Sequence, residues 1–395
     1  MSDTTSAPRG TEQKLAPSVP TVPVAPRRPG MWEALGDQFA LRPLIKEYLI
    51  PVEANNLWYA LGGVLAISLV LEVVTGILLS LVYVPDASRA FDITKGLMQD
   101  ALWALVLNLH YWNAFLIFAL VMVHMMRVFL SGGYRRGKQG LWGVGIGLAA
   151  LTFVVSVTGE SLHWDEVGFG VPWNVGEVAN ALGLGGWLNY DPESLKDIAT
   201  ATAKLGQIYA VHIAIVPILL VLFIGVHYYL IKVKGISAPF WVRGSGRTAP
   251  FSTHIRAWLI YSAVLLGLVL LIAVFVPRDA GTAPQLLPSS PLFNTTDDPG
   301  GLGFKPSFPI SWTRGMNILV ASWGVDPDIW GTIVGMALML LALILVPFVD
   351  RGDHEPGTWR DAFNWRKRGW AFAAIALFWI ILIVGFLEGA FTGAG

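Results

Sequence analysis

Cysteine is absent from this chain of 395 residues, and charged residues are few. Without cysteine, the chain has no disulfide, no thiolate-bound iron–sulfur cluster and no haem attached through thioether bonds, so histidine, methionine or non-covalent contacts must hold any redox centre. Asp, Glu, Lys and Arg form 14% of the residues, whereas soluble domains average roughly 25%. The 27 acidic and 27 basic residues balance. The net charge therefore indicates little about partners, and we expect no nucleic-acid binding.

The chain contains several long apolar runs. Hydrophobic residues form 54% of the chain, and several runs reach the roughly 20 residues that a helix needs to cross a bilayer. We therefore predict an all-α polytopic membrane protein with about seven or eight transmembrane helices. The segment 34–50 is amphipathic and is expected to lie at the membrane interface. Seven spans are predicted at 57–84, 101–130, 141–160, 206–231, 256–276, 328–349 and 369–391.

Basic residues concentrate in the loops that follow the second, fourth and sixth spans. Loops of this kind stay in the cytoplasm, which places the N-terminus there too and the connection 160–200 outside. We expect an integral protein of a prokaryotic inner membrane. The acid-rich connection 160–200 serves either solvation or docking of a partner. The basic residues are Arg135, Arg136, Lys138, Lys232, Lys234, Arg243, Arg247, Arg351, Arg360, Arg366, Lys367 and Arg368.

Two spans each carry a pair of histidines at nearly equal intervals. His110 and His124 are fourteen residues apart, and His212 and His227 are fifteen apart. A helix rises about 1.5 Å per residue, so each pair spans about 21 to 22 Å along its axis. Intramembrane histidines are costly and usually functional. The alternative is isolated hydrogen bonds between helices.

The second and fourth spans run in the same direction across the membrane. His110 and His212 therefore share an outer level, and His124 and His227 share an inner level. One histidine from each helix at each level is the arrangement that bis-histidine haem needs. Such an iron has no open position and transfers electrons without binding oxygen. The four histidines predict two stacked haems.

Two further spans repeat the histidine interval with glycines. Gly62 and Gly76 are fourteen residues apart, as are Gly145 and Gly159. A glycine has no Cβ and lets a flat ring approach the backbone, although glycines in membrane helices also serve helix packing. The matched intervals predict a four-helix bundle around the two macrocycles. Arg127, one turn beyond His124, either pairs with a haem propionate or anchors the helix at the cytoplasmic surface.

These residues resemble the cytochrome b family, the haem subunit of quinol-oxidising Rieske/cytochrome b complexes. The resemblance extends from about residue 34 to the C-terminus. Its fifteen-residue interval is similar to the plastid and cyanobacterial branch, in which a four-helix haem subunit and a three-helix partner are separate chains. Local matches are LWYALGG at 57–63, FLSGGYRRGK at 129–138, IYAVHIAIVP at 208–217 and HYYLIKVKGISAPF at 227–240.

The resemblance implies a division of the chain and a set of cofactors. We predict a disordered tail at 1–33, a four-helix di-haem domain at 34–240 and a fused three-helix part at 241–395. The implied cofactors are two non-covalent b-type haems. His110 and His212 would ligate the outer, low-potential haem iron, and His124 and His227 the inner, high-potential one.

The resemblance also implies substrates and partners. Quinol would be oxidised near the outer haem, and quinone would be reduced near the inner one. The implied partners are a Rieske iron–sulfur subunit, a cytochrome c-type subunit or another redox subunit, within a homodimeric complex. Lys232 and Lys234 either assist the inner quinone site or serve as cytoplasmic anchors. His254 and His354 are expected in cytoplasmic loops, with no role.

Several positions depart from the family pattern. Ala60 replaces the cysteine that attaches an extra haem in photosynthetic members, and Tyr111 replaces a usual arginine. The outer quinol pocket of the family uses a P-E-W-Y stretch with a proton-accepting glutamate, whereas the counterpart here is Pro306-Ser307-Phe308-Pro309, without a carboxylate. The family's L-P-W-D-Q reads Leu162-His163-Trp164-Asp165-Glu166, and Glu160 replaces a usual tyrosine.

These departures leave three hypotheses open for the outer pocket. Quinol oxidation releases two protons and needs a base, so in the first hypothesis Glu160, His163 or Glu166 replaces the missing glutamate. Alternatively, the outer pocket is inactive and the chain is a membrane electron conduit for another oxidoreductase. In the third hypothesis, His163 ligates a further cofactor. A non-redox transporter with structural histidines is the alternative outside this family.

Overall fold

The computed structural model describes residues 48–391, except 136, 189–190, 238, 242–245, 277–310, 325–326, 352–355 and 357. The predicted tail at 1–33 and nearly all of the amphipathic segment 34–50 lie outside the described residues. Residues Glu47–Gly395 form one compact unit. This unit therefore includes the described parts of both the predicted haem domain and the predicted C-terminal part.

The predicted seven spans are confirmed among the described residues as seven helices long and apolar enough to cross a membrane. The first ends at Ser80 instead of residue 84, because the chain turns at Leu81 and Val82. The fourth begins at Ile198, eight residues earlier than predicted, because Asp197 caps it. The predicted all-α class is confirmed apart from one two-stranded ladder of β1 (Leu49–Pro51) and β2 (Thr248–Pro250).

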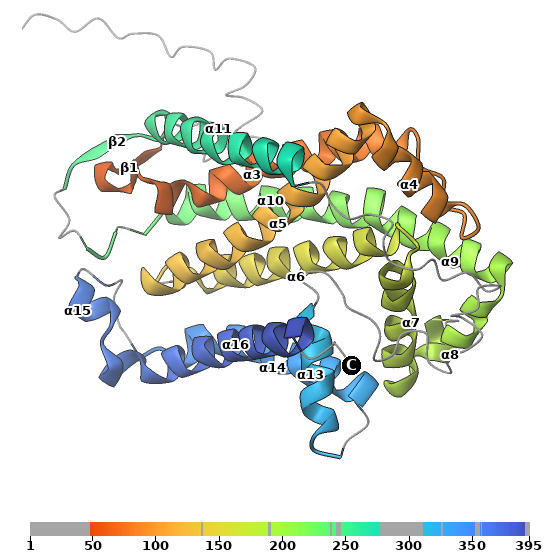
Figure 1. Cartoon of the computed structure of the whole chain (residues 1–395). Coiled ribbons are helices and arrows are strands. Elements are labelled where there is room, and N and C mark those ends of the chain that lie inside the picture. Colours follow the sequence, from red (N-terminus) through yellow and green to blue (C-terminus); the bar gives the residue numbers. More distant parts are fainter. Residues whose placement is uncertain are drawn as a thin grey trace, which may run out of the picture. The chain divides into compact units, whose positions relative to one another are not determined.

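Four spans form a bundle, and they run side by side in Figure 1. Three are single helices, and the fourth is built from three consecutive segments that together cover Ile198–Lys234. Contacts join α3 to α5, α5 to α6, and α6 to α10. The bundle consists of α3 (Leu57–Ser80), α5 (Ala101–Leu130), α6 (Gln139–Ser161), α9 (Ile198–Ala210), the π-helical η3 (Val211–Ile215) and α10 (Val216–Lys234).

Polar side chains mark where the bundle helices begin. The Asn56 side chain accepts a hydrogen bond from the Tyr59 N–H at the start of α3. Asp100 accepts two at the start of α5, and Asp197 accepts one at the start of α9. These bonds satisfy N–H groups that the first turn of a helix leaves unpaired. Hydrogen bonds from Thr200 also hold the pKa of Asp197 below its usual value.

Shorter elements precede the first span or connect the spans. They are η1 (Val52–Ala54), α4 (Ala90–Gln99), α7 (Glu166–Ala181), α8 (Gly185–Leu188), η2 (Pro192–Lys196) and α15 (Trp359–Ala362). Asp165 caps α7 by accepting a hydrogen bond from the Gly168 N–H at 2.8 Å. The turn before it holds Trp164 fully buried with a positive φ of 52°.

The remaining helices cover the bundle from outside. Helix α11 (Phe251–Phe275) packs against α3 and α5. Helices α13 (Ser311–Ala321), α14 (Pro327–Val349) and α16 (Trp365–Phe391) pack on one another, and α14 also contacts α6 and α7. The main apolar core lies where these helices meet α5, and it includes Phe118, Phe129, Trp312, Val346 and Phe378.

The prediction that His254 lies in a loop was wrong. His254 belongs to the first turn of α11 and is buried. Its Nδ1 lies 3.2 Å from Asn55 Oδ1, and its Nε2 lies 3.1 Å from the Tyr59 carbonyl oxygen. The ring therefore joins α11 to the start of α3. His354 lies outside the described residues.

A buried ionic cluster joins the end of α5 to α14 and α16. Asp350 forms ion pairs with Arg135 and with Arg368, whose Nε lies 3.2 Å away. The Arg368 guanidinium also donates to the Phe129 carbonyl at 2.7 Å. Burial raises the pKa of Tyr134, so its hydroxyl stays neutral and donates to Asp350. These bonds compensate the cost of burying the charges.

Replacing Arg368 tests this cluster. Arg368→Ala removes one of the two cations beside the buried Asp350, and breaking a buried pair on one side costs about 3–5 kcal/mol. We expect a lower thermal unfolding midpoint for the detergent-solubilised protein, followed by circular dichroism. Arg366→Ala is the matched control, because Arg366 is exposed on the same helix. Equal midpoints for the two variants would contradict the role of the cluster.

Candidate functional site

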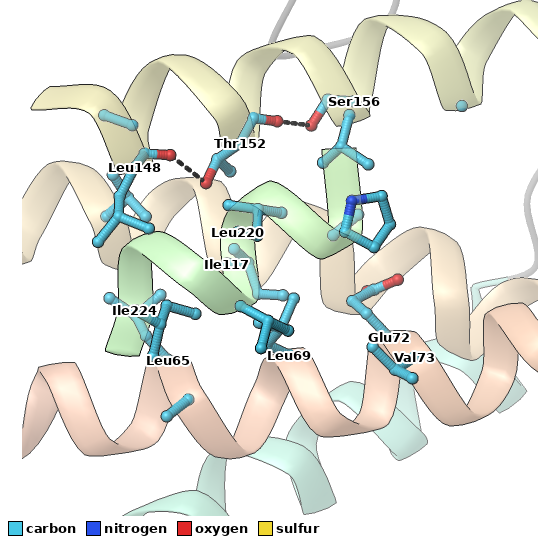
Figure 2. Close-up of a pocket in the computed structure, with 18 of the residues that line it drawn as sticks. Leu65, Leu69, Glu72, Val73, Ile117, Leu148, Thr152, Ser156, Leu220 and Ile224 are labelled. Carbon is cyan, nitrogen blue, oxygen red and sulfur yellow. Dashed lines mark hydrogen bonds between the residues drawn. The ribbon is translucent and has the colours of Figure 1, made fainter. Parts of the chain in front are cut away.

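The interior of the bundle is a cavity of about 680 Å³ that reaches all four histidines. Its wall is mostly apolar, and Figure 2 shows Leu65 and Leu69 from α3 facing Leu220 and Ile224 from α10. The bundle helices do not fill this space with their own side chains. In α10, for example, only Val216 and Leu220 are buried.

The outer histidines face each other across the cavity. The ring centroids of His110 and His212 lie 6.3 Å apart, with an interplanar angle of 73°. Two metal–imidazole bonds of about 2 Å, on opposite sides of one ion, require a centroid separation of about 6 Å. The structure therefore leaves room for one metal ion between these rings.

Hydrogen bonds hold both outer rings by their Nδ1 atoms. His212 Nδ1 lies 3.0 Å from the Val155 carbonyl oxygen and 3.2 Å from Thr158 Oγ1. His110 Nδ1 lies 2.8 Å from Glu72 Oε2 and 2.9 Å from Thr75 Oγ1. A ring held through Nδ1–H leaves Nε2 as the nitrogen that can bind a metal.

The inner histidines line the same cavity without such partners. The Nδ1 atoms of His124 and His227 are buried and have no hydrogen-bond partner among the described residues. Arg127 lies beside them in the cavity wall, with its guanidinium 4.4 Å from the Tyr59 ring centroid. Its Nε is also buried without a hydrogen-bond partner within the described part of the chain. A buried cation beside a cavity suits an anionic group such as a propionate.

Each of the four glycines lies against one histidine. A Cβ built on Gly76 would lie 3.3 Å from His110 Cε1, and one on Gly62 would lie 3.4 Å from His124 Cε1. On α6, a Cβ on Gly159 would lie 2.7 Å from His212 Cε1, and one on Gly145 would lie 3.8 Å from His227 Cε1. The glycines thus sort into the same two levels as the histidines. Flat macrocycles ligated on both faces fit the donor set and the glycine cradle.

A π-helical turn explains how the unequal histidine intervals reach the same two levels. A regular α-helix turns about 100° per residue. An interval of fifteen residues would therefore rotate His212 about 100° further around the helix axis from His227 than an interval of fourteen. The segment Val211–Ile215, which contains His212, is π-helical, and a π turn takes up one additional residue. Pro217 follows and has no N–H to bond the Ile213 carbonyl. This is a local reason for the wider turn.

Two of the three candidate bases reach the outer end of the cavity. Glu160 is buried in the last turn of α6 and lines the cavity, as His163 does. His163 Nδ1 lies 3.1 Å from the Glu160 carbonyl oxygen. Glu166 is the first residue of α7, and its side chain is outside the described part of the structure. The segment Pro306-Ser307-Phe308-Pro309 also lies outside the described residues.

The lysine that lines the inner end of the cavity is neither Lys232 nor Lys234, which the sequence suggested for the inner quinone site. Lys138 is buried, lines the cavity and has its Nζ 3.5 Å from Ser237 Oγ. Lys232 and Lys234 are not among the residues lining the cavity. The Lys232 Nζ lies 5.2 Å from the centroid of the Phe251 ring instead.

Glu72 is the main site residue that the sequence reasoning missed. It lies in the middle of α3, lines the cavity and contacts His110, as described above. Its signal was present in the sequence, because a lone carboxylate inside an apolar span is rare and usually functional. Thr75 and Thr158 carried no comparable signal, since hydroxyls are ordinary in membrane helices.

Comparisons with known proteins agree with this geometry. The family described as Cytochrome b/b6/petB matches residues 45–235. Cytochrome b6 of Euglena gracilis is 32% identical over 186 residues, which are 47% of this chain and 86% of that protein. Cytochrome b6 of Chlamydomonas reinhardtii is 31% identical over 187 residues, with the same coverage of each chain.

A solved structure extends the likeness beyond residue 235. The structure titled "Hyperthermophilic respiratory Complex III" aligns with a TM-score of 0.65 and 19% sequence identity. It covers 91% of this chain and 95% of the other. At this identity the likeness establishes the fold, which includes the C-terminal helices.

A substitution at Gly159 tests the cradle. Gly159→Val places a branched side chain where even a Cβ would meet His212 at 2.7 Å, so we expect the predicted outer haem to be lost and the haem content to fall by one per chain. Gly143→Val on the same helix is the matched control, because a Cβ on Gly143 would meet nothing within 4 Å. The measurement is haem content per purified chain by pyridine haemochromogen assay. Two haems retained in Gly159→Val would refute the cradle.

Proposed function

This chain belongs to the cytochrome b/b6 family of membrane electron-transfer proteins, and we propose that it is the di-haem subunit of a complex that oxidises quinol and reduces quinone. One observation supports this most directly. Two pairs of histidines line one intramembrane cavity at two levels, and each ring lies against a glycine of a neighbouring helix.

The proposed ligands follow from the positions of the side chains. His110 and His212 hold the outer haem, and His124 and His227 hold the inner one. Arg127 pairs with a propionate of the inner haem. When bound, such bis-histidine haems supply one-electron couples at two depths of the membrane, without an open coordination position.

The outer end of the cavity supports a relocated base for quinol oxidation. Glu160 is a buried carboxylate at this end, and His163 lies beside it. The carbonyl oxygen of Glu160 can only accept a hydrogen bond, so His163 donates from Nδ1. In the neutral ring, Nε2 is then the nitrogen that accepts a proton. We assign these two side chains to the proton transfer that the family's usual glutamate performs.

The inner end supports a quinone-reducing pocket near Lys138 and Ser237. An ammonium group there favours a quinone oxygen as it gains negative charge. We further propose that the chain works in a homodimeric complex with a Rieske iron–sulfur, cytochrome c-type or other redox subunit. The fold likeness to a respiratory Complex III structure supports such an assembly. The basic loops support a cytoplasmic position for the N-terminus and the inner haem.

A second function is favoured by one feature of the sequence. Pro306-Ser307-Phe308-Pro309 contains no carboxylate. If Glu160 and His163 take no protons, this chain is an electron conduit between another redox protein and an inner quinone site.

Spectroscopy tests the haem assignment. We expect the purified protein to show a b-type band in its reduced-minus-oxidised spectrum, with two haems per chain. The double variant His124→Ala/His227→Ala should lose the inner haem and retain one. Absence of any b-type band in the native protein would favour a non-redox transporter. An unchanged haem content in the double variant would refute the inner ligand assignment.

Quinol oxidation tests the relocated base. Loss of a general base slows a reaction by about 100-fold or more, so we expect Glu160→Gln or His163→Ala to slow quinol oxidation by the intact complex to this extent. Glu193→Gln is the control, because Glu193 is an exposed carboxylate in η2. If the native complex oxidises quinol at a rate that neither site variant changes, the base lies elsewhere. If the native complex shows the b-type band but oxidises no quinol, this result supports the conduit function.

A further inference from the structure

Glu72 is a carboxylate inside an otherwise apolar helix, and ionisable side chains in such helices are usually functional. Figure 2 shows it on α3 at the cavity wall, near Leu69 and Val73. A charged side chain at this depth is costly unless it is paired. Its contacts identify the group that it serves.

Two N–H donors meet the two carboxylate oxygens of Glu72. His110 Nδ1 lies 2.8 Å from Oε2, and Asn113 Nδ2 lies 2.9 Å from Oε1. Asn113 is itself completely buried, and its Nδ2 also donates to the Ser68 carbonyl oxygen at 2.9 Å. This second contact links Asn113 of α5 to the backbone of α3. Thr75 Oγ1 lies 2.9 Å from His110 Nδ1 and donates to the Leu71 carbonyl.

The four haem-ligating histidines differ in what their Nδ1 atoms contact. Only His110 contacts a carboxylate among the described residues. His212 contacts the Val155 carbonyl and the Thr158 hydroxyl, which are neutral. The Nδ1 atoms of His124 and His227 have no hydrogen-bond partner in the described part of the chain. The outer level thus receives a negative charge that the inner level lacks.

We propose that Glu72 is a positioning residue that orients His110 and lowers the reduction potential of the outer haem relative to the inner one. The proposal rests on the proposed di-haem function. A carboxylate that accepts the Nδ1–H bond fixes the ring and makes the imidazole a stronger electron donor to its metal. Its charge also stabilises the ferric state in a medium of low dielectric constant. Hydrogen bonding to the axial ligand and nearby charge are recognised determinants of haem potential.

The consequence is a built-in direction for electron transfer. An outer couple of lower potential donates to an inner couple of higher potential. Among the described Nδ1 contacts of the four ligands, that of Glu72 is the one made by a carboxylate, and the buried cation Arg127 stands at the inner level. Removal of the Glu72 carboxylate is therefore expected to reduce the difference between the two midpoints.

The test is a redox titration of both haems in the intact complex carrying Glu72→Gln. This change keeps the length of the side chain and an oxygen that can accept the Nδ1–H bond, but removes the charge. Asn113 Oδ1 is buried without a hydrogen-bond partner among the described residues. Turning the Asn113 amide over therefore pairs Oδ1 with the new amide, and it gives up the bond to the Ser68 carbonyl oxygen. We expect the midpoint potential of one haem to rise by about 59 mV. For one electron, this shift increases the ratio of reduced to oxidised haem about tenfold at a fixed ambient potential.

Three controls separate this effect from structural damage. The inner haem of the same molecule should keep its midpoint. Thr75→Val removes a neutral contact from the same nitrogen and should shift the outer midpoint less than Glu72→Gln does. Asn113→Leu keeps the carboxylate but removes a donor to it, so the carboxylate accepts more strongly from His110 and the outer midpoint should fall. A His212→Leu variant should lack the outer haem. The midpoint potential missing from its titration should be the one that Glu72→Gln shifts.

The outcomes distinguish this inference from the proposed function. A native protein without two b-type haems refutes the di-haem function. Two haems with an outer midpoint that Glu72→Gln leaves unchanged, or with both midpoints shifted equally, refute the role of Glu72. If Glu72→Gln fails to bind the outer haem, Asn113→Leu decides the question: a lowered outer midpoint supports the inference, and an unchanged or raised one overturns it. In electron paramagnetic resonance spectra of Glu72→Gln, the low-spin ferric signal of the outer haem should change and that of the inner haem should not.

Discussion

The contact between an imidazole ring and a glycine, repeated four times, is the constraint on which the rest of this structure depends. A Cβ on Gly159 or Gly76 would stand 2.7 or 3.3 Å from its ring, which is too close for ordinary contact, and a Cβ on Gly62 or Gly145 would touch its ring at 3.4 or 3.8 Å. The space between the paired rings stays open to a flat group. A bundle held in this way cannot pack its interior with its own leucines and phenylalanines. Its stability must come from other surfaces.

Those surfaces lie outside the bundle. Helix α11 packs on α3 and α5, and α13, α14 and α16 form the main apolar core together with α5. The buried cluster of Asp350, Arg135 and Arg368 adds a polar contact at the point where α5 ends. The chain thus separates the two tasks of cofactor binding and packing. This separation gives the fused C-terminal helices a structural reason to lie on the haem-binding bundle.

The two ends of the cavity differ in chemistry. The outer end collects Glu72, Glu160 and His163, and the inner end collects Arg127 and Lys138. Carboxylate and imidazole side chains can accept the protons that the proposed quinol oxidation releases, whereas basic side chains suit an anionic propionate and a quinone that gains electrons. The proposed relocation of the base to Glu160 and His163 rests on these polar groups at the outer end.

The sequence by itself determined the membrane class, the seven spans, the two histidine levels and the four glycines, because hydropathy and fixed intervals are local properties of a helix. It also showed that Glu72 is a carboxylate within an apolar span. Only the tertiary structure decided what Glu72 touches, since His110 comes from another helix 38 residues later in the chain. The same reason applies to His254, whose partners Asn55 and Tyr59 are nearly 200 residues away. The π turn at His212, which makes an interval of fifteen equivalent to one of fourteen, is a feature of backbone geometry that residue counting does not reveal.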